Sequence, residues 1–469
     1  MEIELRKTSV IILTYNQLPL TIRCVNSIQK HTVMEEIEII VVDNGSTDGT
    51  VEYLKGLPFI KTCFNPSNVG FAKGCNQGLK LATGDYILFL NNDVIVTENW
   101  LDPMIELLDK ENVGMVGPVS NYVSGLQQIS VDYQDIEQID DFASRYCEQQ
   151  RGKSRRVLRL VGFCLLTKQE ILEKIGGFDE RFVYGSFEDD DLCLRALQEG
   201  YQLHISLDSF IHHHGHATFN GNQDIDIHYL YHENRRRFID KWQIDLTYFT
   251  HPRPEIVDLV PIEARKILDV GCGAGATGLE LLNRQPCQLY GIELNALVSS
   301  IAKAHYETVD HTDVEALELS YPLGYFDTII FADILEHLKD PWKVIENLSK
   351  FLKPNGSIIC SIPNISHAEA LIPLLQGSWH YTDAGILDRT HLRFFTPQTV
   401  HTLFPSTQFE IIEQRYQQIA VETNVELFLN EVIHLAENFG FNMDQLANYS
   451  KVYQILIHVT KSETNESQI

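Results

Sequence analysis

Two aspartates in the first half of the chain follow apolar runs of the kind that form buried strands. Asp43 comes directly after residues 37–42 (IEIIVV), and Asp93 comes shortly after residues 86–90 (YILFL). Ligands of parallel α/β sheets bind beyond the carboxyl ends of the strands, where both carboxylates should lie. Asp93 could bind a divalent cation there, and the cation could bind a diphosphate. Asp43 could accept hydrogen bonds from a base or ribose. The alternative interpretation of Asp93 is a plain turn, since asparagine and aspartate favour turns.

A run of four acids, Glu188 to Asp191, precedes an amphipathic helix expected over residues 192–199. Acidic side chains in a first helical turn complement the helix dipole, which could account for Asp190 and Asp191. A general base that takes the proton of an acceptor hydroxyl is the other possibility, because clustered carboxylates raise one another's pKa.

In the second half, a glycine-rich turn follows residues 265–270 (RKILDV). Its glycines are Gly271, Gly273 and Gly275. Glu293 ends the next apolar run, at about the 20-residue spacing of a ribose-binding acid. The glycines would let the backbone approach a cofactor. Because residues 273–278 also satisfy GxGxxG, a nicotinamide-dependent dehydrogenase is the alternative to other nucleotide cofactors.

The segments that would position these side chains alternate between strand and helix patterns. Such alternation is typical of parallel α/β sheets, so we expect the fold class to be α/β in both halves. The main predicted strands cover residues 9–13, 37–42, 86–90, 265–270, 288–293, 326–332, 357–362, 409–416 and 452–459. Residues 422–448, between the last two, are expected to form a helical insertion.

The length of 469 residues predicts two or three domains at roughly 100–200 residues each. The sequence His251-Pro252-Arg253-Pro254 would interrupt any helix. We therefore expect a first domain over residues 1–250 and a second over residues 251–469.

The composition excludes several classes of protein. A net charge of −27, from 37 basic and 64 acidic residues, argues against a nucleic-acid-binding protein. Nine scattered cysteines without a CxxC pair argue against a zinc site and indicate reduced thiols. We find neither a signal-peptide layout nor an apolar run of about 18 residues, so we expect a cytoplasmic protein without a transmembrane segment.

The first half resembles the family 2 glycosyltransferases, which have the GT-A fold. The stretches that carry the resemblance are VIILTYNQ, IIVVDNGSTDGT, NVGFAKGCNQGL, GDYILFLNNDV, VGFCLLTKQEILEKIGGFDERF, FEDDDLCLRALQEGY and FIHHHGHAT, over about residues 5–220. The resemblance implies inverting transfer of a sugar, of the hexosyltransferase type, from a nucleotide-diphosphate sugar to an acceptor hydroxyl.

The same resemblance assigns roles to individual residues. Nucleotide-sugar binding would fall to Thr14, Tyr15, Asn16, Asp43, Gly70 and Asn92. Asp93 matches the last aspartate of the family's DxD metal motif, whose first position is Asn91 here, and His213 matches a histidine near the diphosphate. The implied ion is Mn²⁺ or Mg²⁺. Asp189 matches the catalytic base, and Glu188 is its acceptor-orienting neighbour.

The second half resembles the class I S-adenosylmethionine-dependent methyltransferases, a Rossmann-like fold, over about residues 264–460. Asp269 and the three glycines form the DxGxGxG of motif I, and FDTIIFA and the stretch FLKPNG continue the match. The cofactor-binding residues implied by the resemblance are Asp269, Gly271, Gly273, Gly275, Glu293, Asp313 and Asp333. His337 is a candidate base, and an insert over residues 377–395, with His380, Asp388 and His391, should line the acceptor pocket.

Together these patterns predict a bifunctional enzyme that glycosylates and methylates, the methylation being on oxygen, in surface polysaccharide biosynthesis. The expected partners are a nucleotide-diphosphate sugar, with uridine or deoxythymidine favoured over guanosine, and a glycan or lipid-linked saccharide acceptor. The acceptor would bring the protein into peripheral contact with the inner face of the membrane. Three alternatives stay open: one catalytic domain with a binding module, a scaffold without chemistry, or a NAD-binding oxidoreductase in the second half.

Overall fold

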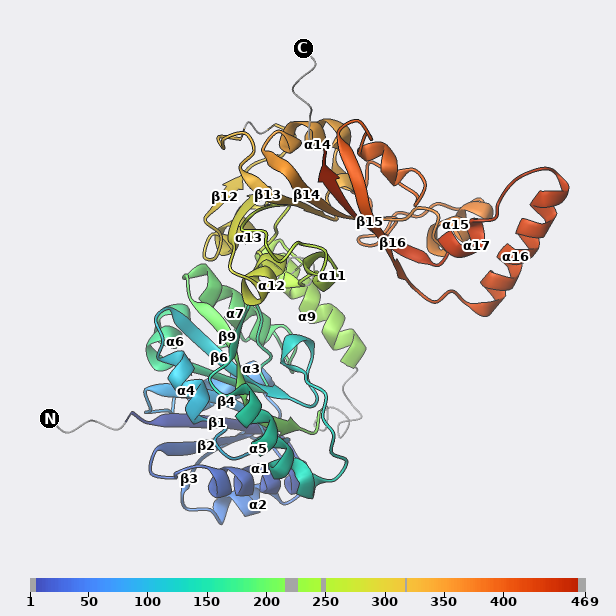
Figure 1. The fold of residues 1–469 in the computed structure, drawn as a ribbon. Coiled ribbons are helices and arrows are strands. Elements are labelled where there is room, and N and C mark those ends of the chain that lie inside the picture. The colour runs from blue at the N-terminus through green and yellow to red at the C-terminus, as the bar shows by residue number, and fades with distance from the viewer. Residues whose placement is uncertain (1–5, 216–226, 246–249, 317–318, 463–469) are drawn as a thin grey trace. The chain divides into compact units, whose positions relative to one another are not determined.

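The computed structural model describes residues 6–215, 227–245, 250–316 and 319–462 (Figure 1). Its backbone contacts divide the chain into two compact units, Met1–Thr250 and His251–Ile469. Within the described residues, no helix combines the length and the apolar character that crossing a bilayer requires.

The first unit is built on a mixed sheet in the order β3-β2-β1-β4-β8-β6-β9-β5, with β7 paired to β9. Its strands are β1 (Thr8–Thr14), β2 (Ile37–Asp43), β3 (Ile60–Phe64), β4 (Tyr86–Asn91), β5 (Val94–Val96), β6 (Val113–Ser120), β7 (Ser154–Val157), β8 (Cys164–Lys168) and β9 (Gln202–His213). Its helices are α1 (Leu18–His31), α2 (Thr50–Lys55), α3 (Phe71–Leu79), α4 (Asp102–Leu108), α5 (Ile139–Gln150), α6 (Gln169–Ile175), α7 (Glu188–Gln198) and α9 (Ile227–Trp242).

Both faces of the parallel part of this sheet are covered, because alternate residues of β1 enter different cores. Val10 and Ile12 pack with Cys24, Val25 and Ile28 of α1 in one buried cluster. On the other face, glycines allow α3 to approach closely: a Cβ at Gly74 would lie 2.3 Å from Leu13 Cδ1, and one at Gly78 would lie 2.5 Å from Ile11 Cγ2. This two-sided burial explains the continuous apolar runs of β1 and β2.

The expectation that the strands run parallel holds only for part of the first sheet. Strands β1 to β4 pair in parallel, whereas β8 runs antiparallel to both β4 and β6, and β5 and β7 run antiparallel to β9. The helix expected from residue 192 also begins earlier, because the acidic run itself forms the first turn of α7.

The second unit contains a sheet in the order β12-β11-β10-β13-β14-β16-β15. Its strands are β10 (Lys266–Val270), β11 (Gln288–Glu293), β12 (Thr308–His311), β13 (Phe326–Ala332), β14 (Leu352–Pro363), β15 (Phe409–Gln418) and β16 (Val452–Lys461). Its helices are α11 (Pro254–Val257), α12 (Ala276–Arg284), α13 (Ala296–Ala302), α14 (Pro341–Ser349), α15 (Ala368–Leu375), α16 (Thr423–Asn438) and α17 (Leu446–Tyr449), with short 3-10 helices η3 (Leu335–His337) and η4 (Val400–Leu403).

The order of strands reverses between β10 and β13. The chain runs outward from β10 through β11 to β12 and then returns to β13 on the other side of β10, all in parallel. Such a switch point opens a crevice at the carboxyl ends of the strands, where ligands of open α/β sheets bind. Antiparallel β16 and β15 complete the sheet beyond β14, and α16 and α17 lie between them in the sequence, where a helical insertion is expected.

Candidate active sites of the two units

Parallel register brings three predicted side chains to one level in the first unit. Thr14 pairs with Asp43 across β1 and β2, and the backbone N–H of Asn44 donates to the carbonyl of Thr14 at 2.8 Å. On the other side of β1, the Asn92 amide donates to Thr14 Oγ1 at 3.2 Å and to Thr21 Oγ1 at 3.1 Å. The structure therefore joins Thr14, Asp43 and Asn92 at the sheet edge. Thr21 is a member of this network that motif matching did not find.

Asp43 is fully buried and half satisfied. Its Oδ1 accepts from the backbone N–H groups of Gly45 and Ser46, both at 3.0 Å. Its Oδ2 is buried and has no hydrogen-bond partner within the described part of the chain. A buried oxygen without a donor is costly unless a ligand supplies one, so this geometry suits a ribose hydroxyl or a base N–H.

Asn16 and Gly70 shape the loops around this edge. The Asn16 backbone N–H donates to Ser46 Oγ at 2.7 Å, and its Oδ1 accepts from the N–H of Thr47 at 2.8 Å, so its side chain holds the loop after β2. Gly70 has φ +91°, and a Cβ there would lie 3.2 Å from the backbone nitrogen of Tyr184. Tyr15, which follows Thr14, is partly exposed.

Asp93 and His213 face one another across paired strands, since Val94 of β5 is in register with His213 of β9. His213 Nδ1 lies 2.8 Å from the carbonyl oxygen of Tyr122, which can only accept, so Nδ1 carries a hydrogen. In the neutral imidazole the Nε2 lone pair then points at Asp93 Oδ1, 3.2 Å away. Two acceptors at this distance need a proton or a cation between them.

The Asp93–His213 pair could hold either a proton or a cation between its two acceptor atoms. Burial raises the pKa of the Asp93 carboxyl, but the hydrogen bond and charge of His213 outweigh burial and lower it overall. When His213 is neutral, the charged carboxylate would instead suit a divalent cation, with His213 as a second ligand in place of the proton. His214, which sequence analysis did not single out, has a buried Nε2 without a hydrogen-bond partner among the residues described.

Two of the four acids of α7 are neutralised by cations of the same unit. Asp191 is fully buried and accepts from Arg195 Nε at 2.9 Å, from Trp242 Nε1 at 2.9 Å, and from Lys241. Asp190 is paired with Arg159. Burial raises the pKa of Asp190 to about 6, against the charge of Arg159, which lowers it.

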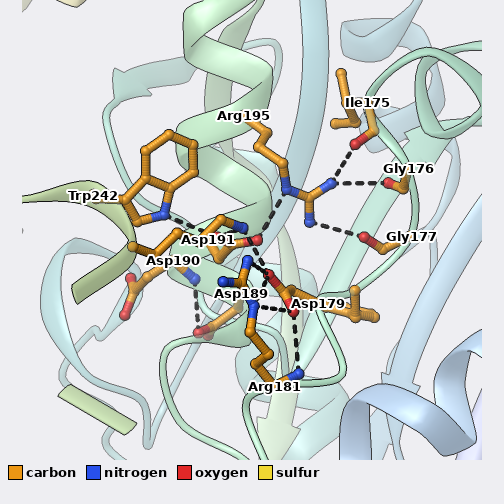
Figure 2. Close-up of polar contacts among 12 residues, drawn as sticks. Ile175, Gly176, Gly177, Asp179, Arg181, Asp189, Asp190, Asp191, Arg195 and Trp242 are labelled. Carbon is orange, nitrogen blue, oxygen red and sulfur yellow. Dashed lines mark hydrogen bonds and ion pairs between the residues drawn. The ribbon is translucent and has the colours of Figure 1, made fainter. Parts of the chain in front are cut away.

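Arg195 also fixes the loop that precedes the acids. Its guanidinium donates to the carbonyls of Ile175, Gly176 and Gly177 at 2.5, 3.1 and 2.8 Å (Figure 2). Asp191 and Arg195 therefore tie α7 to the end of α6. The turn that leads into α7, residues 184–187, has φ of +64°, +112°, +76° and +72°, a conformation that non-glycine residues rarely adopt.

Glu188 and Asp189 form no ion pair within the described residues, although the charge of Arg159 acts on both. Asp189 Oδ2 accepts from the N–H of Gly162 at 2.8 Å, and Asp189 is 6% exposed. Glu188 Oε2 is buried without a partner in the described structure, and burial together with Asp189 holds the pKa of Glu188 well above its ordinary value. The adjacent Phe163 stacks on His213 with ring centroids 5.2 Å apart. The Gly162–Phe163 dipeptide thus links the Asp189 region to the Asp93–His213 pair.

In the second unit the glycine turn is held by Glu293. Its Oε2 accepts from the N–H of Gly273 at 2.9 Å, and its Oε1 accepts from the N–H of Asn295 at 2.7 Å. Gly271 and Gly275 have φ of +72° and +86°, which only glycine adopts without strain. The structure therefore brings the predicted glycines and Glu293 together at the switch point.

Asp269 lies beneath this turn and is bound to a residue that motif matching missed. The Tyr306 hydroxyl donates to Asp269 Oδ2 at 2.7 Å. A Cβ at Gly278 would lie 2.2 Å from the same hydroxyl oxygen, so the tyrosine fills the space under the turn. Burial raises the pKa of Asp269 to about 6, and the Tyr306 hydrogen bond opposes that rise.

The remaining predicted acids have other partners. Asp313 is exposed, and its Oδ1 accepts from the N–H of Glu315 at 2.9 Å, which stabilises a turn. Asp333 accepts from Ser361 Oγ at 2.8 Å and is also bound by Gln454 and Arg253. The three partners of Asp333 come from distant parts of the chain, which is why sequence motifs did not reveal them.

The second unit also brings two of the candidate acceptor-side histidines together. The rings of His337 and His391 meet edge to face with centroids 4.7 Å apart, beside buried Glu336. Asp388 reaches His337 through Thr390, whose hydroxyl lies between them. His380 is exposed and belongs to no such group.

Comparison with known proteins matches the two halves of the chain to two different families. Residues 9–176 match the family model for glycosyl transferase family 2, and residues 231–414 match a model for a methyltransferase domain. The roles assigned above to single residues stay predictions, because these matches identify domains and not side-chain functions.

Three curated relatives match parts of the chain. A ubiquinone biosynthesis O-methyltransferase of Paracidovorax citrulli is 27% identical over 34% of this chain and 68% of its own length. The O-antigen biosynthesis protein RfbC of Myxococcus xanthus is 28% identical over 45% of this chain, which spans only 18% of RfbC. Protein y4gI of Sinorhizobium fredii is 27% identical over 49% of this chain and 26% of its own length.

The buried charge cluster predicts a stability difference. Asp191→Asn removes the carboxylate that pairs with Arg195 and one of the two that pair with Lys241, which keeps Asp179. Because a buried ion pair is broken, we expect a loss of about 3–5 kcal/mol in the free energy of unfolding. Asp132→Asn is the matched control, because its pair with Arg145 is exposed and is worth about 0–1 kcal/mol. Urea unfolding followed by circular dichroism measures both, and equal losses would contradict the structural role of Asp191.

The buried Asp269 carboxyl predicts a pH dependence. Its pKa of about 6 in the folded protein exceeds the ordinary value of 3.8, so the folded state holds a proton that the unfolded state releases. Its contribution therefore makes stability fall as pH rises from about 4 to about 6, by roughly 1.4 kcal/mol per pKa unit. Asp269→Asn should gain stability relative to the wild type over that interval, measured by urea unfolding at several pH values. A constant difference between the two proteins would disprove it.

Proposed function

We propose that this chain, which carries a family 2 glycosyltransferase domain followed by a methyltransferase domain, is a bifunctional transferase. Residues 1–250 would transfer a sugar from a nucleotide-diphosphate sugar, and residues 251–469 would transfer a methyl group from S-adenosylmethionine. The observation that carries the proposal is that each unit has a buried carboxylate at the ligand-binding edge of its sheet. In the first unit Asp43 Oδ2 has no donor within the described residues, and in the second unit Glu293 holds the glycine turn.

The first domain would use a single displacement with inversion. Asp43 and the Thr14–Asn92 network support nucleotide binding, and Asp93 with His213 would hold a Mn²⁺ or Mg²⁺ ion, which neutralises the leaving diphosphate. Asp189 would take the proton of the acceptor hydroxyl as its oxygen bonds to the sugar carbon. The bond from that carbon to the diphosphate breaks, and its electron pair leaves with the nucleotide.

The division of labour among the acids of α7 supports this assignment. Asp190 and Asp191 are engaged by Arg159, Arg195 and Lys241, so their charges serve the fold. Within the described residues, Asp189 accepts hydrogen bonds from the backbone N–H groups of Gly162 and Asp190, which leaves lone pairs for a proton. Glu188, whose Oε2 has no partner within the described structure, would orient the acceptor hydroxyl.

The second domain would methylate an oxygen. S-adenosylmethionine supplies an electrophilic methyl group on a sulfonium. Gly271, Gly273 and Gly275 support binding of its methionine part, and Glu293 would bind the ribose hydroxyls while holding the turn through Gly273. The O-methyltransferase relative favours oxygen as the methylated atom.

We further propose that both transfers serve one surface glycan or lipid-linked saccharide. The relative in O-antigen biosynthesis supports this substrate class. Two catalytic domains in one chain also raise the local concentration of a shared intermediate. Methylation of the glycosylated product by labelled S-adenosylmethionine, but not of the unglycosylated acceptor, is the result that supports coupling.

Asp189→Asn tests the base. Because general base catalysis contributes roughly 10²- to 10⁴-fold, we expect kcat for nucleoside diphosphate release from the donor sugar to fall by that factor. Nucleotide affinity should not change, since the hydrogen bonds of Asp189 go to Gly162 and Asp190 and not to the loop that binds Asp43. Asp140→Asn, a surface substitution of the same type, is the control. Normal turnover by Asp189→Asn would remove this residue from the mechanism.

A thermal-shift panel tests both cofactor sites on the intact chain. Uridine, deoxythymidine and guanosine diphosphates with and without Mn²⁺, S-adenosylhomocysteine, and NAD would be added separately. A ligand at 100 times its Kd stabilises by about 2.7 kcal/mol, which raises Tm measurably. We expect shifts with one nucleoside diphosphate and with S-adenosylhomocysteine. A shift with only one of them would favour a single catalytic domain, and a shift with NAD would favour an oxidoreductase.

A further inference from the structure

Glu336, His337 and His391 form a compact cluster in the second unit, which we call the Glu–His–His cluster. Each residue offers one potential ligand atom, and the three atoms lie within 4.8 Å of one another. Glu336 and His337 come from η3, and His391 comes from the loop before η4. The two segments are joined by backbone bonds, because the N–H groups of Leu392 and Arg393 donate to the carbonyl of Glu336 at 2.7 and 3.0 Å.

Hydrogen bonds fix the tautomer of both histidines. His391 Nδ1 lies 3.0 Å from the carbonyl oxygen of Ile386, which can only accept, so Nδ1 carries the hydrogen and Nε2 carries the lone pair. The Thr390 hydroxyl donates to Asp388 Oδ1 at 2.6 Å and therefore accepts from His337 Nδ1 at 3.0 Å. Both imidazoles thus keep a free Nε2 lone pair, the arrangement typical of metal-binding histidines.

Glu336 supplies the third observation. The residue is 1% exposed, and its Oε2 is buried without any hydrogen-bond partner among the residues described. An unsatisfied buried carboxylate oxygen is strongly unfavourable, and it lies beside two imidazoles that have lone pairs and no proton to give. A cation satisfies all three atoms at once.

The cluster also lies near the ligand-binding edge of its sheet. It follows directly after β13, whose carboxyl end borders the switch point between β10 and β13. Ile334, two residues before Glu336, contacts the glycine turn, since a Cβ at Gly271 would lie 2.8 Å from Ile334 Cδ1. An ion held here would therefore lie beside the cofactor crevice and not at the far end of the strands.

We propose that Glu336, His337 and His391 bind one divalent transition-metal ion, separate from any ion at Asp93 and His213. Two imidazoles and one carboxylate suit Zn²⁺, Co²⁺ or Mn²⁺ and are a poor set for Mg²⁺, which prefers oxygen ligands. Three protein ligands leave at least one coordination position open, as in catalytic sites.

The open position would take the acceptor oxygen, a role that rests on the proposed methyl transfer. A hydroxyl bound to such an ion has a lowered pKa and releases its proton to water more readily. The oxygen then forms a bond to the methyl carbon while the carbon–sulfur bond of the donor breaks. The products are a methyl ether and a neutral thioether, so that charge and atoms balance.

Titration with Co²⁺ tests the site without any activity assay. The intact chain would carry Asp93→Asn to remove the first candidate ion, and it would be stripped with a chelator and titrated while visible spectra are recorded. We expect one Co²⁺ per chain, with ligand-field bands and without the near-ultraviolet charge-transfer band of thiolate ligands. Adding His391→Gln should weaken binding at least tenfold.

Thr390→Val tests the hydrogen-bond chain without touching a ligand. Loss of a partner that orients a ligand histidine typically weakens metal affinity roughly 10- to 100-fold, and we expect that loss here. Thr382→Val is the matched control, because the Thr382 hydroxyl donates to the carbonyl of Ala384 in the same loop and not to a proposed metal ligand. Equal Kd values for the two variants would overturn the assigned tautomer of His337.

The outcomes separate the site from the function. Unchanged Co²⁺ binding in a folded His391→Gln chain, verified by circular dichroism, would overturn the metal site. Tight binding without S-adenosylhomocysteine binding in the thermal-shift panel would leave the site standing and overturn the proposed methyl transfer instead.

Discussion

Parallel strand pairing is the constraint that sets the Thr14–Asp43 edge of the first unit and the glycine turn of the second. In the first unit the register sets Thr14 against Asp43 and Leu13 against Asn91, so that the polar residues beyond three strands share one edge. In the second unit the register of β10 with β11 sets Val270 against Ile292, which brings the following glycines beside Glu293. A shift by one residue would turn each side chain to the other face and dismantle the site.

Buried charge is distributed unequally along this scaffold. Where a cation is available, as for Asp191 with Arg195 and Lys241, the carboxylate joins helices and loops to one another. Other buried carboxylate oxygens accept no hydrogen bond in the described structure, namely Asp43 Oδ2, Glu188 Oε2 and Glu336 Oε2. The fold tolerates this desolvation cost at positions where a ligand or ion can offset it.

Sequence patterns predicted the local parts of this arrangement well. The apolar runs at residues 37–42 and 86–90 are strands, and the glycines after β10 form the expected turn beside Glu293. Family motifs also identified both domains. Contacts between distant segments were beyond such patterns: nothing in the neighbourhood of Asp333 indicates Arg253, and nothing near Asp269 indicates Tyr306. The pairing of Glu336 with His391 likewise depends on a loop whose path only the folded chain defines.

The turn of residues 184–187 has a consequence for how this protein can vary. Four successive residues with positive φ, only one of them glycine, place the chain in a conformation in which side chains with a branched Cβ clash with the backbone. Mutational drift at Tyr184, Ser186 and Phe187 should therefore run toward glycine and asparagine and away from valine and isoleucine.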